Sequence, residues 1–165
     1  MSDTFELSRL LGERLLARGW LLVTAESCTG GGIASAVTDI SGSSGWFDRG
    51  YVTYSNAAKE EALGVPRATL DRDGAVSEAT ARAMAAGALA RSAAQLAVAV
   101  TGVAGPTGGS VAKPVGTVWF GYAVSGGAVY ARQHRFDGDR AAVRTQTVER
   151  ALRDLIRLAD GLEPG

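Results

Sequence analysis

The sequence has few of the residues that build disulfides and metal sites. Its 165 residues include one cysteine, Cys28, and one histidine, His134. A single cysteine excludes an internal disulfide, and this pair supplies too few ligands for a zinc site of nitrogen and sulfur atoms. Carboxylate sites for magnesium stay open on composition alone, but we predict chemistry that needs no metal and no cofactor.

The chain also lacks net charge and long apolar runs. Seventeen lysines and arginines balance seventeen aspartates and glutamates, so no overall field attracts nucleic acid or an anionic membrane. Polar residues and glycines interrupt every apolar run before the roughly 18 residues of a membrane span, and the polar, acidic N-terminus is unlike a signal peptide. We therefore predict a cytoplasmic protein with no membrane or nucleic-acid partner.

What the chain does have is apolar material for one core, since 46% of its residues are hydrophobic and its length is typical of one domain. We predict a single domain over residues 1–165. Leucines at helical spacing between positions 7 and 16 predict a first helix, which begins after a cap among residues 2–4 and stops at Gly19. A final helix is predicted at 140–160, capped by Asp137 or Asp139. Further helices are expected at 31–40, at 57–63 after Asn56 as cap, and at 78–92 after Ser77 as cap.

Short apolar and β-branched runs between these helices predict strands. Three are expected at residues 20–25, 46–55 and 96–101, and a hairpin at 116–124 and 128–136 is expected around the turn Gly126-Gly127. Strands that alternate with helices and then end in a hairpin are typical of the α/β class. We predict a three-layer α/β/α sandwich with a mixed, mostly parallel central sheet.

Three junctions rich in glycine or hydroxyl residues follow predicted strands. They are AESCTGG at 25–31, TYSNAAK at 53–59 and TGVAGPTGG at 101–109. Ligands in open α/β sheets bind beyond the carboxyl ends of the strands, so we expect the junctions to converge on one site. The third matches no P-loop because no GK[ST] follows its glycines. Its N–H groups suit a phosphate or an oxyanion, although such a loop can also be a simple connection.

The first two junctions contain candidates for nucleophilic catalysis. Ser27 precedes a helix start, where a hydroxyl can attack a substrate, although capping the helix is the more common role. Lys59 can serve as its base if burial or a positive dipole lowers the lysine pKa. A lysine in this position is more often solvated, and Tyr54 is more often a packed strand residue.

Four blocks of the sequence together resemble the CinA C-terminal domain family over roughly residues 5–160. In chain order they are AESCTGG, GSSGWFDRGYVTYSNAAKEEALGV, AVTGVAGPTGG with KPVGTVWFGY, and GDR followed by a helix. The resemblance implies a nicotinamide-nucleotide amidase, which converts nicotinamide mononucleotide and water to nicotinic acid mononucleotide and ammonia in pyridine nucleotide salvage. Some family members carry a further N-terminal domain that this chain lacks, so it is similar to the stand-alone amidases.

Carried over by position, the resemblance implies Ser27 as nucleophile, with Tyr54 and Lys59 as its activating partners. Lys59, neutral or sharing a proton through Tyr54, would accept the hydroxyl proton and later protonate ammonia. Either glycine-rich loop could stabilise the oxyanion or hold the phosphate or ribose. Residues expected to bind the substrate are Glu26, Thr29, Gly30, Gly31, Thr101, Gly102, Ala104, Gly105 and Arg140. For Arg140, and for Arg144, a solvated helix face is the more common role.

Two other readings of the sequence stay open. A thiol at a helix N-terminus acidifies readily, so Cys28 could be the nucleophile, but its base is missing because His134 lies in a hairpin strand. Alternatively, the chain is a catalytically silent nucleotide-binding or competence-related interaction module. In either case the predicted partners are a small-molecule nucleotide and further copies of the chain, with Trp46 and Phe47 as an exposed apolar contact in a homodimer or larger assembly.

Overall fold

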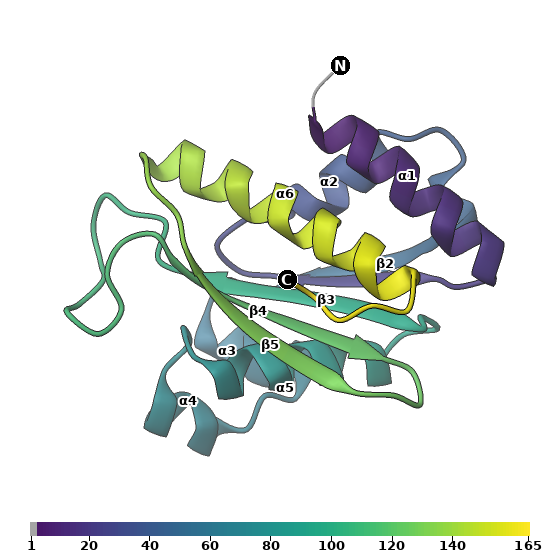
Figure 1. The fold of residues 1–165 in the computed structure, drawn as a ribbon. Helices are drawn as coiled ribbons and strands as arrows, with labels where there is room; N and C mark the ends of the chain where they lie inside the picture. The colour runs from purple at the N-terminus through teal and green to yellow at the C-terminus, as the bar shows by residue number, and fades with distance from the viewer. Residues whose placement is uncertain (1–2) are drawn as a thin grey trace.

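The computed structural model of the chain describes residues 3–165, which form a five-stranded sheet between two layers of helices (Figure 1). Helices α1, α2 and α6 cover one face of the sheet, and α3, α4 and α5 cover the other. In chain order the elements are α1 (Asp3–Arg18), β1 (Leu22–Glu26), α2 (Gly32–Thr38), η1 (Ser43–Gly45), β2 (Phe47–Val52), α3 (Asn56–Leu63), α4 (Arg67–Asp73), α5 (Glu78–Ala90), β3 (Leu96–Gly102), β4 (Thr117–Val124), β5 (Val129–Arg135) and α6 (Arg140–Ala159).

The strand order is β2-β1-β3-β4-β5. Strand β1 pairs in parallel with β2 and β3, whereas β4 pairs antiparallel with β3 and β5. Within the described residues, β4 alone therefore runs against the other four strands. The predicted α/β class and three-layer architecture with a mixed sheet are confirmed, and the carboxyl ends of β1, β2 and β3 meet at one edge.

Local sequence signals explain most element boundaries. Ser77 caps α5 by accepting a hydrogen bond from the Thr80 N–H, and Asp139 caps α6 in the same way, both as predicted. The cap of α3 is Ser55, not Asn56, because the Ser55 hydroxyl accepts from the Ala58 N–H at 3.0 Å. The seven-residue helix α4 was not predicted, since the breakers that flank it resemble those of a loop.

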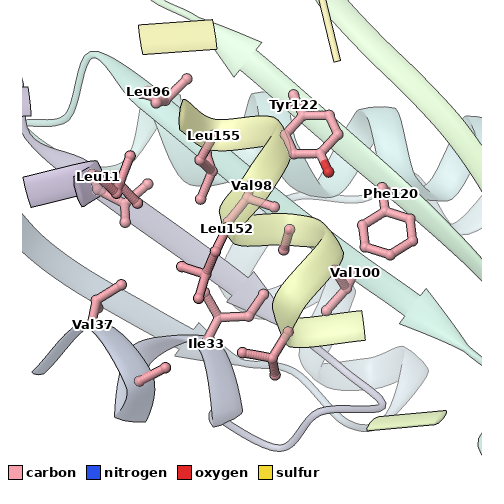
Figure 2. Packing of buried hydrophobic residues seen from close by; sticks show 14 of the residues in the cluster. Leu11, Ile33, Val37, Leu96, Val98, Val100, Phe120, Tyr122, Leu152 and Leu155 are labelled. Atoms are coloured by element: carbon pink, nitrogen blue, oxygen red, sulfur yellow. The ribbon is translucent and has the colours of Figure 1, made fainter. Parts of the chain in front are cut away.

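The two faces of the sheet carry side chains of different size. Leu96, Val98 and Val100 of β3 point toward α6, where they pack with larger apolar residues of α1, α2 and α6 (Figure 2). The alternate residues Ala97 and Ala99 face the alanine-rich helix α5. Small side chains on both surfaces let α5 lie close to the sheet, whereas the other face has the thicker core.

The indole of Trp46 lies in the larger core and is 2% exposed. It packs so closely on α1 that a Cβ added at Gly12 would lie 2.7 Å from its ring. Phe47 is half-buried against the same core. The predicted exposed contact through these residues is therefore wrong, because helix α1 covers the site where the indole lies. The prediction that the chain forms a homo-oligomer remains, but Trp46 and Phe47 no longer support it.

Gly121 of β4 lies directly under the backbone of α5. A Cβ at this position would lie 2.1 Å from the Ala81 carbonyl oxygen, which is backbone and cannot rotate away. We expect Gly121→Ala to lower the free energy of unfolding by about 2 to 3 kcal/mol because of overpacking. Gly127→Ala is the matched control, since its Cβ would come no closer than 3.5 Å to Val124 and its φ is not positive. Urea denaturation of both variants tests this, and equal midpoints would contradict it.

Candidate active site

The three predicted junctions converge beyond the carboxyl ends of β1, β2 and β3, where they enclose a cavity of about 230 Å³. The segment between α4 and α5 forms a further wall. The lining residues are Ser27, Cys28, Tyr54, Lys59, Ala75, Val76, Thr101, Gly102, Ala104 and Arg140. The convergence follows from parallel pairing, which brings the three strand ends to the same edge of the sheet.

Ser27 is the first residue beyond β1 and is held by the neighbouring strand. Its N–H donates to the Val100 carbonyl of β3 at 3.0 Å. The chain then turns, and the Gly30 N–H donates back to the Ser27 carbonyl at 3.1 Å. Gly30 and Gly31 have positive φ angles of 58° and 101°, a conformation that other residues rarely adopt. These glycines let the chain reverse between β1 and α2 directly after the serine.

Lys59 lines the cavity and is 1% exposed. It is in the first turn of α3, and its Nζ is 3.1 Å from the Ser27 Oγ. The same nitrogen donates to the carbonyl oxygens of Thr53 at 2.9 Å and Tyr54 at 3.4 Å. No acidic side chain of residues 3–165 forms a salt bridge with it. Burial therefore lowers the pKa of Lys59 below its ordinary value.

These contacts can orient a neutral amine. An uncharged lysine has two N–H bonds and one lone pair. If the two carbonyl oxygens of Thr53 and Tyr54 take both hydrogens, the lone pair is left for the Ser27 hydroxyl. The arrangement is thus that of a general base beside an alcohol nucleophile, within the reach that proton transfer needs.

The ring of Tyr54 is placed differently from the prediction. Its hydroxyl accepts a hydrogen bond from Arg140 Nη2 at 3.1 Å, and the residue is 63% exposed. Only its main-chain carbonyl contacts Lys59. The structure therefore gives no direct path for proton sharing from Lys59 to the phenol. Instead, Tyr54 and Arg140 meet at the cavity wall, where Arg140 also donates to the Gly105 carbonyl at 2.9 Å.

Glu26 does not line the cavity, although it was predicted to bind the substrate. Its side chain is fully buried, and its carboxylate accepts from the Thr29 hydroxyl at 2.5 Å and from the N–H groups of Ile33 at 2.7 Å and Ala34 at 3.0 Å. These are bonds to the turn and to the first turn of α2, whose N-terminus favours a negative charge. Glu26 and Thr29 therefore shape the loop, and neither faces the cavity. Gly30 and Gly31 likewise lie outside the lining.

From the third junction, Gly102 and Ala104 line the cavity. The Thr101 hydroxyl also lies there, but it donates to the Ala75 carbonyl at 2.9 Å and so holds the opposite wall in place. That wall, with Ala75 and Val76, was missed by sequence reasoning. The only signal was its position between a glycine and the cap of α5, which is typical of any loop.

Cys28 lines the cavity, but its chemistry differs from the thiolate considered above. Burial raises the pKa of the thiol to about 11, so the reactive thiolate is scarce near neutral pH. The short helix α2 does not acidify it, because the carboxylate of Glu26 occupies the helix N-terminus and itself raises the thiol pKa. A cysteine nucleophile is therefore not supported.

His134 is outside this site. Its ring lies on β5 and packs edge-on against Phe120 and parallel to Phe136. Burial lowers the pKa of the imidazole. This packing gives His134 a structural role in the hairpin strand.

Known proteins are similar to this chain over nearly its whole length. The family model described as the CinA C-terminal domain matches residues 4–159, and the chain belongs to that family. A nicotinamide-nucleotide amidohydrolase PncC from Enterobacter agglomerans is 56% identical over 156 residues, which cover 92% of this chain and 95% of the relative. The protein of the same name from Escherichia coli K12 is 52% identical and is covered to 93%, as is this chain.

Solved structures show the same fold. The competence/damage inducible protein CihA from Agrobacterium tumefaciens superposes with a TM-score of 0.93 at 50% identity, over 96% of each chain. A CinA superfamily protein from Klebsiella pneumoniae has a TM-score of 0.93 at 40% identity and covers 97% of this chain and 99% of its own. Within residues 3–165, no helix is long and apolar enough to cross a membrane, and no cluster of three or more acidic, histidine or cysteine side chains could hold a metal ion.

Proposed function

We propose that this chain is a nicotinamide-nucleotide amidase of the cytoplasm, which hydrolyses the carboxamide of nicotinamide mononucleotide to nicotinic acid mononucleotide and ammonia. One observation carries the proposal. The Ser27 Oγ and the Lys59 Nζ lie 3.1 Å apart at a cavity, in a chain that is 52–56% identical to relatives named for this activity.

In the first half-reaction, Ser27 Oγ attacks the carboxamide carbon while its proton passes to Lys59 Nζ. The C–N bond of the tetrahedral intermediate then breaks, and the same proton leaves on the nitrogen as ammonia. An ester between Ser27 and the nicotinoyl group remains. Water attacks that ester, Lys59 accepts one water proton, and this proton returns to Ser27 Oγ as the carboxylic acid leaves, which then loses its own proton to solvent and becomes the carboxylate product.

The developing oxyanion needs N–H donors near Ser27. The Gly30 N–H is already bonded to the Ser27 carbonyl, and the Ser27 N–H is bonded to β3. Cys28 follows the nucleophile and lines the cavity, so we propose its main-chain N–H as a donor. The oxyanion would thus be bound by the first junction, which contains Cys28. The third junction would then be free to bind the nucleotide end of the substrate.

The cavity is smaller than the range of about 300 to 1,000 Å³ that is usual for small-molecule sites. Its volume suits the nicotinamide ring and not the whole nucleotide. A neighbouring hollow of about 480 Å³ shares Ala104 and Arg140 with it. We propose that the ribose phosphate extends into this hollow, where Arg140 supplies the cation for the phosphate.

The test is ammonia release by purified protein with three substrates: nicotinamide mononucleotide, nicotinamide riboside and nicotinamide. We expect turnover of the nucleotide, with kcat/KM lower for the riboside and lowest for nicotinamide, because each truncation removes binding contacts. Calorimetric binding of the nucleotide without any ammonia release would instead identify the silent binding module.

A further inference from the structure

The loop that carries Ser27 is held by side chains on two sides, and neither of them lines the cavity. On one side is Arg144 of α6, and on the other is Glu26 at the end of β1. The two residues are far apart in the sequence, so it is the tertiary fold that brings both of them to the same loop. Neither is placed to touch a substrate directly, which separates them from the catalytic pair.

Arg144 contacts the loop through two nitrogens of its guanidinium group. Its Nε donates to the Cys28 carbonyl at 3.1 Å, and its Nη2 donates to the Thr29 carbonyl at 3.2 Å. The two accepting carbonyls belong to consecutive residues, so a planar fork of donors can bond both of them together. A lysine ammonium has no such fork and would bond one of them well.

Glu26 contacts the same loop from within the fold. It has no salt bridge within residues 3–165, and its carboxylate is bonded to the Thr29 hydroxyl and to two N–H groups of α2. Thr29 therefore binds Glu26 through its side chain and Arg144 through its carbonyl. The peptide units directly after Ser27 are thus restrained from two directions.

We propose that Arg144 and Glu26 are positioning residues that hold the turn after Ser27, and with it the Ser27 Oγ, against Lys59 Nζ. The proposal rests on the amidase function above. Misplacement of a reacting atom by about 1 Å can cost about 100-fold in rate. Because the two residues act through the loop, their loss should slow the chemical step without weakening substrate binding.

The first experiment compares Arg144→Met, Arg144→Lys and the control Arg153→Met. Arg153 lies on the same helix and is exposed, as Arg144 is, but among residues 3–165 it has no hydrogen bond or salt bridge. For Arg144→Met we expect kcat to fall by about 100-fold while KM stays within about twofold. Arg144→Lys should regain about tenfold of that loss, since one carbonyl keeps a charged donor. Arg153→Met should match the wild type.

A second readout separates this proposal from the amidase function. Labelling of Ser27 by a fluorophosphonate, followed by intact-protein mass spectrometry, reports nucleophile geometry without any substrate. We expect labelling of Arg144→Met and Glu26→Gln to be at least about tenfold slower, with Arg153→Met unchanged. If the wild type is labelled quickly but releases no ammonia, the amidase assignment fails and the positioning role stands on the labelling rates.

Three results would overturn the positioning role. They are an Arg144→Met enzyme with kcat and labelling rate within twofold of wild type, a raised KM with unchanged kcat, and an Arg144→Lys enzyme no faster than Arg144→Met. If Arg144→Met fails to fold by circular dichroism, Arg144→Lys decides, because an unchanged kcat and labelling rate in that variant contradict the need for two donors.

Discussion

Replacing Ser27 by alanine is expected to lower kcat for ammonia release from nicotinamide mononucleotide by at least about a thousandfold. The substitution removes the attacking oxygen and leaves Lys59 with no alcohol to deprotonate. Ser27 is 8% exposed, and the bond that its main chain donates to Val100 does not depend on the hydroxyl. The variant should therefore fold and bind the nucleotide, which calorimetry can measure beside the activity assay.

Cys28→Ser is the matched control for that experiment. It changes the adjacent residue of the same cavity, whose thiol has a pKa raised to about 11 and takes no part in the proposed chemistry. We expect kcat within about tenfold of wild type. If Cys28→Ser loses activity and Ser27→Ala keeps it, the nucleophile is the thiol and the mechanism is wrong.

Replacing Lys59 by methionine is expected to cost a similar factor, at least about a thousandfold in kcat. Methionine fills much of the same space but cannot accept a proton. Lys59→Arg should be equally inactive, because a guanidinium stays charged in proteins. The buried position at 1% exposure makes arginine harder to fit, so thermal unfolding of both variants should accompany the kinetics. Activity in Lys59→Met above one hundredth of wild type would exclude lysine as the base.

Lys59 also sets the pH dependence that we expect for kcat/KM. The base form of Lys59 is the neutral amine, so kcat/KM should rise with pH through the lysine pKa and level off above it. Burial lowers that pKa, so the midpoint should lie below the ordinary lysine value of about 10.4. A pH profile of kcat/KM for wild type and Cys28→Ser tests this, since a limb that belongs to Lys59 should persist when the thiol is removed. A limb that disappears in Cys28→Ser would assign it to the thiol.

Much of this protein could be read from local patterns. The period of apolar residues predicted α1 and α6, and Gly126-Gly127 predicted the β4–β5 hairpin, because these signals depend on neighbours in the chain. Ser27 and Lys59 could be named from their places after a strand and in the first turn of a helix. Their pairing followed from the rule that parallel strands end at one edge of the sheet.

Other features depend on packing between distant segments. Trp46 looks like an exposed aromatic in a Gly-Ser loop, but α1 covers it because Gly12 leaves room for the indole. Glu26 looks like a site residue and Arg144 like a solvated one, yet the first is buried under α2 and the second reaches the loop from α6. Such contacts join residues up to 116 positions apart, which no local periodicity encodes.

By itself, then, the sequence determined the order of helices and strands and the residue types for an alcohol nucleophile and an amine base. Only the tertiary structure decided which groups surround each of them. Two carbonyls direct the Lys59 amine toward Ser27, and the Tyr54 ring turns to Arg140. The physical reason is that burial and hydrogen-bond partners are set by the packed neighbours, and the pKa of the lysine follows from them.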